Sequence, residues 1–432
     1  MILLFKKEDC MTKLLFVNAR LLDNSLVCLA TEGRKIAYIG ETRPEGEFDR
    51  VIDCRGNLLM SGFYNTHCHA AMTLFRGYGE DMSLREWLDT RILPAEERLD
   101  ADKVKYGSLM AIAEMLASGI VSFSDMYFFC DHTAEAVLES GIKANLSRSL
   151  VSFEEGMTAR GDSRFLEGVS LAKTYHGADE GRIIVDMSIH AEYSNVESYI
   201  RDVSAYTAEN GLMMQLHLSE TESEHNACIA RRGKTPTEFF RDCGTFLSPT
   251  TCAHGVWLSE SDMDILAEHK ATVSHNPCSN LKLGSGIARV KTMTEHGVNV
   301  ALGTDGAASN NSLDFFREMY VASLIAKGSA LDPTVGKARD VLKLATENGA
   351  FAQRRLDCGK LEVGYRADLV LVSLEDINTT PTYDPIYTVL YAAKAQNVKM
   401  TVVDGRILYE NGVYTTLDIE KIKDNFKRVC DY

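Results

Sequence analysis

Eight short apolar runs alternate with longer segments of helical period, and this pattern constrains the fold more than any other feature of the chain. Residues 103–118 and 260–269 are two of the helical segments. Strands that alternate with helices favour repeated βα units and a parallel sheet, and eight such units can close into a (β/α)8 TIM barrel. The expected barrel strands are 58–64, 119–123, 142–147, 183–189, 212–216, 250–253, 271–274 and 298–302.

The two ends of the chain follow a different pattern. Segments 13–20, 25–30 and 35–40, like 367–372 and 398–409 near the other end, alternate apolar and polar residues as antiparallel strands do. We therefore expect an α/β protein in which a small β-sandwich domain, built from both chain ends, accompanies the barrel. The expected division is 1–60 for the first part of the sandwich, 61–357 for the barrel and 358–432 for the second part of the sandwich.

Charge and cysteine usage narrow the class of protein. Lys and Arg number 46 against 61 Asp and Glu, and the net charge of −15 argues against a nucleic-acid or anionic-membrane surface. Eleven cysteines without CxxC spacing, and no recognisable signal segment, predict reduced thiols and a cytoplasmic location. Met11 is an alternative start. A small molecule is the expected partner, with no nucleic acid and no membrane.

Each expected strand is followed within a few residues by a polar or ionisable side chain. In (β/α)8 barrels the chemistry takes place at the C-terminal ends of the strands, so this placement predicts an active site. The residues concerned are His67 and His69, Asp125, Arg148, His190, His217 and Glu220, His254, His275 and Asn276, and Asp305.

His67 and His69 are two residues apart, so a strand would place both imidazoles on one face with their Cα atoms about 6 to 7 Å apart. His217 ends the fifth expected strand, and Asp305 follows the eighth. Three imidazoles and one carboxylate suit zinc, with iron, manganese or cobalt as alternatives. The hypothesis is one divalent metal ion held by these four residues.

A bound divalent ion can lower the pKa of its water towards ~7 and so supply an attacking hydroxide at neutral pH. In this hypothesis Asp305 accepts a proton, Glu220 protonates a ring nitrogen of the substrate, and His254 stabilises developing charge. Structural roles are the alternative: a single strand-end histidine is often only part of a core, and Asp305 could simply form a turn. His275 and Asn276 could brace a loop, and Asp125 is interpreted as a structural neighbour.

Several motifs resemble those of the amidohydrolase superfamily, and within it the 5'-methylthioadenosine/S-adenosylhomocysteine deaminases. The likeness spans nearly the whole chain. The motifs are GFYNTHCH (62–69), HLSE (217–220), AH (253–254), HNPCSNLK (275–282), GTDGAAS (303–309) and GKLEVGYRADLV (359–370).

The resemblance implies roles for further residues. Glu96 matches the residue that holds the ribose of a nucleoside, and His190 matches a contact to the purine or the ribose. Arg148 and Arg160 match positions that meet the amino-acid carboxylate of S-adenosylhomocysteine, a task that suits the planar guanidinium group. Relatives of this fold often self-associate, so a homo-oligomer is an open alternative.

The chain departs from the family pattern at two points. Glu192 stands where the family usually has proline, so we expect an extra carboxylate near the purine. No lysine stands at the exit of the fourth expected strand, where dinuclear relatives carry a bridging lysine, and this favours a single metal ion.

The resemblance implies hydrolytic deamination of an adenine nucleoside, such as S-adenosylhomocysteine, 5'-methylthioadenosine or adenosine, to the inosine analogue with release of ammonia. Deamination of a guanine, cytosine or pterin ring, or hydrolysis of a chlorotriazine, would use the same metal site. A catalytically silent barrel that serves as an interaction module would need a broken ligand set, whereas His67, His69, His217, Glu220 and Asp305 are all present.

Overall fold

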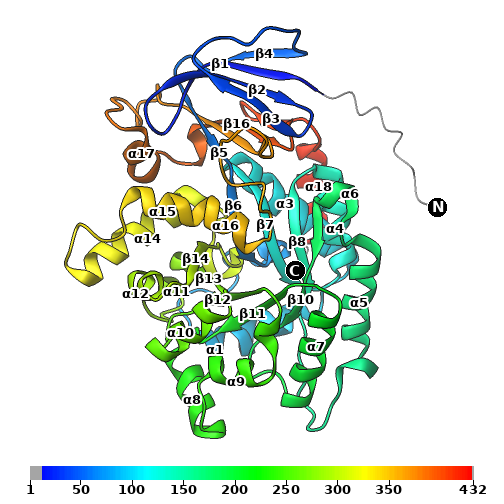
Figure 1. The fold of residues 1–432 in the computed structure, drawn as a ribbon. Helices are drawn as coiled ribbons and strands as arrows, with labels where there is room; N and C mark the ends of the chain where they lie inside the picture. The colour runs from blue at the N-terminus through cyan, green and yellow to red at the C-terminus, as the bar shows by residue number, and fades with distance from the viewer. Residues whose placement is uncertain (1–11, 431–432) are drawn as a thin grey trace.

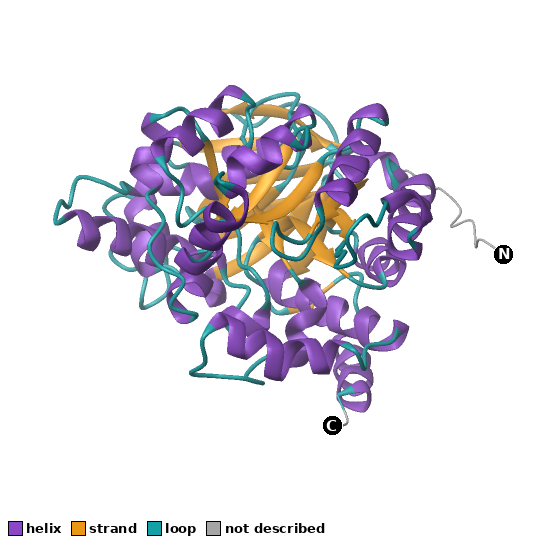
Figure 2. Ribbon diagram, turned by 90° about the horizontal axis from the view of Figure 1, so that it is seen from below, coloured by secondary structure: helices purple, strands orange, loops and turns teal. Residues whose placement is uncertain are grey.

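Parallel strands in two sheets form the barrel in the computed structural model, which describes residues 12–430; Met11, the alternative start, lies outside the described residues. One sheet has the order β6-β7-β8-β9 and the other the order β10-β11-β12-β13-β14. Figure 2 shows the strands in the middle of the molecule with helices around them. The strands are β6 Phe63–Cys68, β7 Ile120–Tyr127, β8 Lys143–Arg148, β9 Ile183–Val185, β10 Met187–Ile189, β11 Met214–Leu218, β12 Thr250–His254, β13 Thr272–His275 and β14 Asn299–Leu302.

Backbone hydrogen bonds join the two sheets at both of their junctions. The amides of Thr304 and Asp305, just after β14, donate to the carbonyl oxygen of His67 on β6 at 3.1 and 2.9 Å. The amide of Asp186, between β9 and β10, donates to the carbonyl oxygen of Leu146 on β8 at 2.9 Å. The expectation of a TIM-barrel-type fold is therefore confirmed.

Two of the expected strands are each divided in the structure. The segment 58–64 divides at Gly62 into β5 (Leu58–Ser61), which belongs to the other sheet of the protein, and β6. A Cβ atom at Gly62 would lie 2.3 Å from Cγ1 of Val121, so glycine is required where the chain passes from one sheet to the other. The segment 183–189 divides at Asp186, and its two halves pair with different neighbours.

Helices cover the outside of the barrel. The expected helices are confirmed as α3 (Ala101–Ala117) and α10 (Glu260–Glu268), with Asp100 and Ser259 as N-caps. None of the helices within residues 12–430 combines the length and apolar character needed to cross a membrane. The others are α1 Leu84–Trp87, α2 Leu93–Glu96, α4 Cys130–Ser140, α5 Ser163–Tyr175, α6 Ala178–Gly181, α7 Glu197–Glu209, α8 Glu222–Arg232, α9 Pro236–Asp242, α11 Pro277–Lys282, α12 Val290–Glu295, α13 Ala307–Asn310, α14 Phe315–Ala330, α15 Ala338–Ala345, α16 Glu347–Ala352, α17 Pro385–Tyr387 and α18 Ile419–Val429.

A nine-stranded sheet from both chain ends lies beside one end of the barrel (Figure 1). Its order is β18-β17-β16-β15-β5-β1-β2-β3, with β4 paired to β1. The antiparallel pairing of β1, β2 and β3 was expected, whereas the parallel pairing of β4 and β5 with β1 was not. The strands are β1 Leu14–Arg20, β2 Leu26–Glu32, β3 Lys35–Gly40, β4 Arg50–Asp53, β15 Leu369–Val372, β16 Val398–Val403, β17 Arg406–Glu410 and β18 Val413–Tyr414, together with β5.

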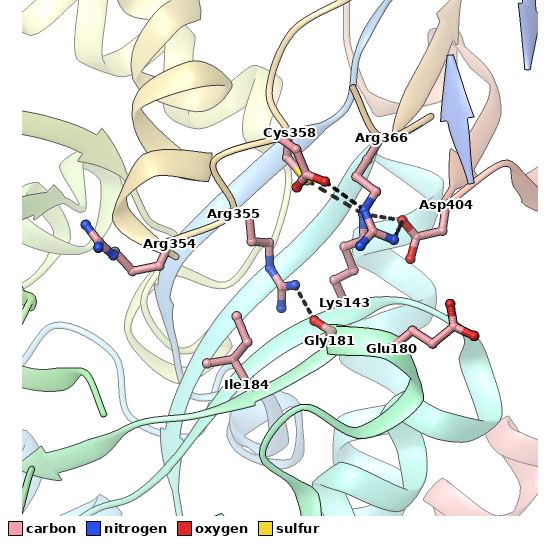
Figure 3. Close-up of a pocket in the computed structure, with 10 residues that line it drawn as sticks. Lys143, Glu180, Gly181, Ile184, Arg354, Arg355, Cys358, Arg366 and Asp404 are labelled. Carbon is pink, nitrogen blue, oxygen red and sulfur yellow. Dashed lines mark hydrogen bonds and ion pairs between the residues drawn. The ribbon is translucent and has the colours of Figure 1, made fainter. Parts of the chain in front are cut away.

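Buried ion pairs join this sheet to the barrel. Lys143, the first residue of β8, lies 2.5 Å from Asp368 and 2.8 Å from Asp404, and all three side chains are buried. Lys143 and Asp404 line a pocket that Figure 3 shows. In it Arg366 lies beside Asp404, and Arg355 donates to the carbonyl oxygen of Gly181. Because this pocket lies where β8 and β9 begin, its polar groups stabilise the end of the barrel opposite to the strand exits.

Candidate active site

Three imidazoles converge where β6 and β11 end. His67 lies on β6, His69 follows its last residue, and His217 lies on β11. The Nδ1–H of His69 donates to the carbonyl oxygen of Met126 at 2.6 Å, and that of His217 donates to the carbonyl oxygen of His190 at 2.7 Å. Both Nε2 atoms are therefore left as acceptors, and they lie 3.4 Å apart. Fixing one ring nitrogen in this way is typical of histidines that bind metals through the other.

Asp305 brings a carboxylate to the same point. Its Oδ1 lies 3.6 Å from Nε2 of His67 and 3.3 Å from Nε2 of His69. Its Oδ2 accepts hydrogen bonds from the hydroxyls of Ser279 and Ser309 at 2.6 and 2.9 Å. The carboxylate is therefore fixed through one oxygen, and its other oxygen faces the imidazoles.

The donor set fits a divalent metal ion. Nε2 of His67 is buried and has no hydrogen-bond partner among the described residues, which is costly for a polar atom unless something else binds it. Burial lowers the pKa of His67 to about 4 and that of His217 well below its usual range, so both rings are neutral and their lone pairs are free. Ligand atoms of His67, His69 and His217 lie within 4.8 Å of one another, as do those of His67, His254 and Asp305.

Glu220 and His254 lie beside this cluster. The Glu220 carboxylate accepts a hydrogen bond from the Ser285 hydroxyl at 3.0 Å, and its other oxygen lies 3.7 Å from Nε2 of His254. Nδ1 of His254 donates to the side-chain oxygen of Asn280 at 2.8 Å, which leaves Nε2 facing Glu220. Burial raises the pKa of Glu220 above its usual range, and a carboxyl that holds its proton can act as an acid near neutral pH.

Strained backbone accompanies these side chains. Ser219, His254 and Asp305 have φ angles of 47°, 75° and 58°, a region that residues other than glycine seldom adopt. Such strain persists only where the surroundings hold it, and it is concentrated at functional sites. Its presence at the exits of β11, β12 and β14 agrees with an active site at this end of the barrel.

The residues expected to bind substrate differ from one another in their burial and in the partners they already have. The His190 ring lies 4.9 Å from the His217 ring and its Nδ1 lies 2.9 Å from the Ser194 hydroxyl. Glu96 ends α2, and burial raises its pKa to about 7. Arg148 already pairs with Glu167 at 2.7 Å and lies over the Phe128 ring. Arg160 is exposed on the short helix Ala159–Gly161 and takes no part in the contacts that hold the buried cluster.

Glu192 does not supply a free carboxylate. Its side chain is fully buried, and its two oxygens lie 2.6 Å from Nη2 of Arg231 and 2.5 Å from Nε of Arg232, both on α8. Two guanidinium groups balance its charge, so the expected extra carboxylate is present but paired, and its place near the purine stays a prediction. The sequence could not show this pairing, since 39 and 40 residues separate the partners.

Other supporting residues were missed by sequence reasoning. The Asp305, Glu220 and His254 side chains are held by four residues whose type alone does not identify this role in the sequence: Ser279, Asn280, Ser285 and Ser309. Asp125, interpreted as a structural neighbour, accepts a hydrogen bond from the amide of Ala70 at 2.7 Å. The side-chain nitrogen of Asn276 lies 3.4 Å from Nδ1 of His254, beside the ring that Asn280 holds.

A barrel that gathers imidazoles and a carboxylate at its strand exits is the architecture of metal-dependent hydrolases. The model of the Amidohydrolase family matches residues 58–408, and the chain belongs to this family.

Named relatives agree with this assignment. The chain is 44% identical over 400 residues to a 5'-deoxyadenosine deaminase of Methanosarcina acetivorans, covering 93% of this chain and 92% of that one. It is 41% identical over 387 residues to a 5-methylthioadenosine/S-adenosylhomocysteine deaminase of Dictyoglomus thermophilum, covering 90% of each. Among solved structures, a zinc-bound adenosine deaminase from Xanthomonas campestris superimposes with a TM-score of 0.90 at 28% identity, covering 97% of both chains.

Proposed function

We propose that this protein is a metal-dependent hydrolase that deaminates the 6-amino group of an adenine nucleoside to give the inosine analogue and ammonia. The observation that carries the proposal is the convergence of the His67, His69 and His217 rings with Asp305, beside a buried Glu220. The relatives named as nucleoside deaminases support the choice of reaction.

His67, His69, His217 and Asp305 would hold the metal ion, which when bound makes water a nucleophile at neutral pH. The reaction forms a C6–O bond and breaks the bond from C6 to the amino nitrogen. One proton of the water ends on N1 of the ring and the other on the leaving ammonia. Burial raises the pKa of Glu220, which favours the protonated form of its carboxyl, and this carboxyl would donate to N1.

His254 is placed to manage charge and the second proton. Asn280 fixes its ring, and the negative charges of Glu220 and Asp305 raise its pKa despite the opposing effect of burial. It can therefore carry a proton at Nε2, on the side that faces Glu220. Asp305, whose Oδ2 is held by Ser279 and Ser309, keeps Oδ1 as the oxygen that accepts a proton.

Among adenine nucleosides, we favour substrates with an uncharged 5' group, such as 5'-deoxyadenosine or 5'-methylthioadenosine. The resemblance places Arg148 against the carboxylate of S-adenosylhomocysteine, but here Glu167 already pairs with that guanidinium group. Glu96 is proposed to hold the ribose hydroxyls and His190 to contact the nucleoside. Arg160, being exposed, would have to move to reach a substrate.

The remaining proposals concern the whole protein. A single zinc ion is favoured because three imidazoles and a carboxylate suit it, and because the Xanthomonas deaminase binds zinc. We also propose a cytoplasmic enzyme, divided at 1–60, 61–357 and 358–432, whose smaller part is a β-sandwich; self-association remains open.

The test is an activity screen with metal-loaded protein. S-adenosylhomocysteine, 5'-methylthioadenosine, adenosine and 5'-deoxyadenosine are incubated separately, with guanine, cytosine and pterin compounds as comparators. We expect ammonia and an inosine-type product, identified by mass, from the adenine nucleosides. Turnover of a comparator alone, or of no adenine nucleoside, would reject the proposal.

A further inference from the structure

Glu224 binds the backbone that carries Glu220. Its Oε1 accepts the amide N–H of Ser219 at 3.1 Å, and its Oε2 accepts the amide N–H of Glu220 at 2.9 Å. The residue is only 9% exposed, so both hydrogen bonds are shielded from water. Each oxygen of the carboxylate meets one N–H donor, an arrangement that the ionised form satisfies best. Burial and the nearby Glu220 raise the pKa of Glu224 to about 7, so both hydrogen bonds are strongest above this pH.

The backbone that Glu224 binds is strained. Ser219 has a φ of 47°, and this conformation directs the chain from β11 into the loop that presents Glu220. A serine in this conformation costs about 1 to 3 kcal/mol and needs external support. The charge-assisted hydrogen bonds from the two consecutive amides to Glu224 provide that support.

Glu224 is itself anchored at the start of α8. The Thr221 hydroxyl accepts the amide N–H of Glu224 at 3.2 Å and caps the helix. At the other end of α8, Arg231 and Arg232 bind the buried Glu192, which follows β10. The helix is therefore attached to the barrel at both ends, and Glu224 projects from a fixed element.

We propose that Glu224 is a positioning residue, which holds the peptide between Ser219 and Glu220 so that the Glu220 carboxyl stays against the Ser285 hydroxyl and beside His254. The inference rests on the proposed role of Glu220 in proton transfer. Glu224 does not itself face the imidazole cluster through a hydrogen bond; its effect on the reaction is transmitted through the backbone.

The experiment compares E224Q with E222Q, which alters an exposed glutamate in the same first turn of α8. In E224Q the new amide group points a donor at a backbone N–H, so at least one of the two hydrogen bonds is lost. Hydrogen exchange of the peptide that contains Ser219 and Glu220 is measured on the metal-loaded proteins. We expect exchange about tenfold faster in E224Q and unchanged in E222Q.

Kinetics provide the second measurement. For E224Q we expect kcat to fall about 100-fold, with KM within about twofold of the wild type and the metal content unchanged. E222Q should retain wild-type kcat. If E224Q cannot be purified, E224D serves, because it keeps the charge but is too short to reach both amides.

The outcomes separate this inference from the proposed function. Wild-type protein that deaminates no nucleoside rejects the proposed function, while the exchange comparison still tests the support of the loop. Unchanged exchange in E224Q, or wild-type kcat, overturns the positioning role. Joint loss of metal, substrate affinity and thermal stability would assign Glu224 to the fold in general and would overturn it as well.

Discussion

Replacing Glu220 by glutamine tests the proposed proton donor at nearly constant volume. The glutamine oxygen can still accept the hydrogen bond from the Ser285 hydroxyl, which is 3.0 Å from the carboxylate in the wild type. What is lost is the transferable proton, and general acid catalysis contributes about 10² to 10⁴ in rate. Because Glu220 is buried and water cannot easily replace it, we expect a loss of about 10³ in kcat, with little change in KM.

The assay measures ammonia release at saturating nucleoside, together with metal content by elemental analysis. Ser285→Ala is the matched control: it removes one hydrogen bond to the Glu220 carboxyl but leaves that carboxyl in place, so kcat should fall only about tenfold. Full activity in E220Q with bound metal would refute the assignment of Glu220 as the donor. A larger loss of kcat in S285A than in E220Q would refute the proposal that Glu220 contributes more to catalysis than Ser285 does.

Three further substitutions test other parts of the structure. E192Q removes the buried charged partner of Arg231 and Arg232 and should lower the free energy of unfolding by about 2 kcal/mol, measured by urea denaturation. An unchanged midpoint would contradict a stabilising role for these two ion pairs. E167Q should raise kcat/KM for S-adenosylhomocysteine about threefold relative to 5'-deoxyadenosine, because it frees Arg148, and an unchanged ratio would remove the basis for the proposed preference. Burial raises the pKa of Glu96 to about 7, so it is protonated below this pH and ionised above it. KM should therefore fall as the pH rises through about 7, since the ionised form accepts hydrogen bonds from ribose better, and E96Q should show a flat profile if the assignment is right.

The order of the barrel strands could be predicted from the sequence because apolar runs and helical segments differ in period. The division of the first run at Gly62 could not, since it depends on how close Val121 comes to that backbone. The break at Asp186 was hidden for a similar reason: the residue's backbone and carboxylate bind β8 and β11, and such partners lie far away in the sequence. These strands are also buried on both faces, so their sequences are mostly apolar and show no sign of where a strand is interrupted.

Within the site, position at the end of an expected strand predicted some of the functional residues but not others. Four residues lie at the ends of apolar runs or within a few residues of them, and the structure brings their side chains together: His67, His69, His217 and Asp305. The serines and the asparagine that orient the site lie on the short helices α11 and α13 or, for Ser285, in a loop, and segments this short show no periodicity that identifies them. Glu192 shows the converse difficulty, because its position beside His190 indicated a substrate contact while its side chain turns to Arg231 and Arg232.

The central claim is that His67, His69, His217 and Asp305 hold one metal ion. Anomalous diffraction from crystals of active protein, recorded on both sides of the zinc absorption edge, tests it most directly. The account predicts a single strong peak per chain between the Nε2 atoms of the three histidines and Oδ1 of Asp305. Active crystals without a peak there, or with a peak bound only by other residues, would contradict it.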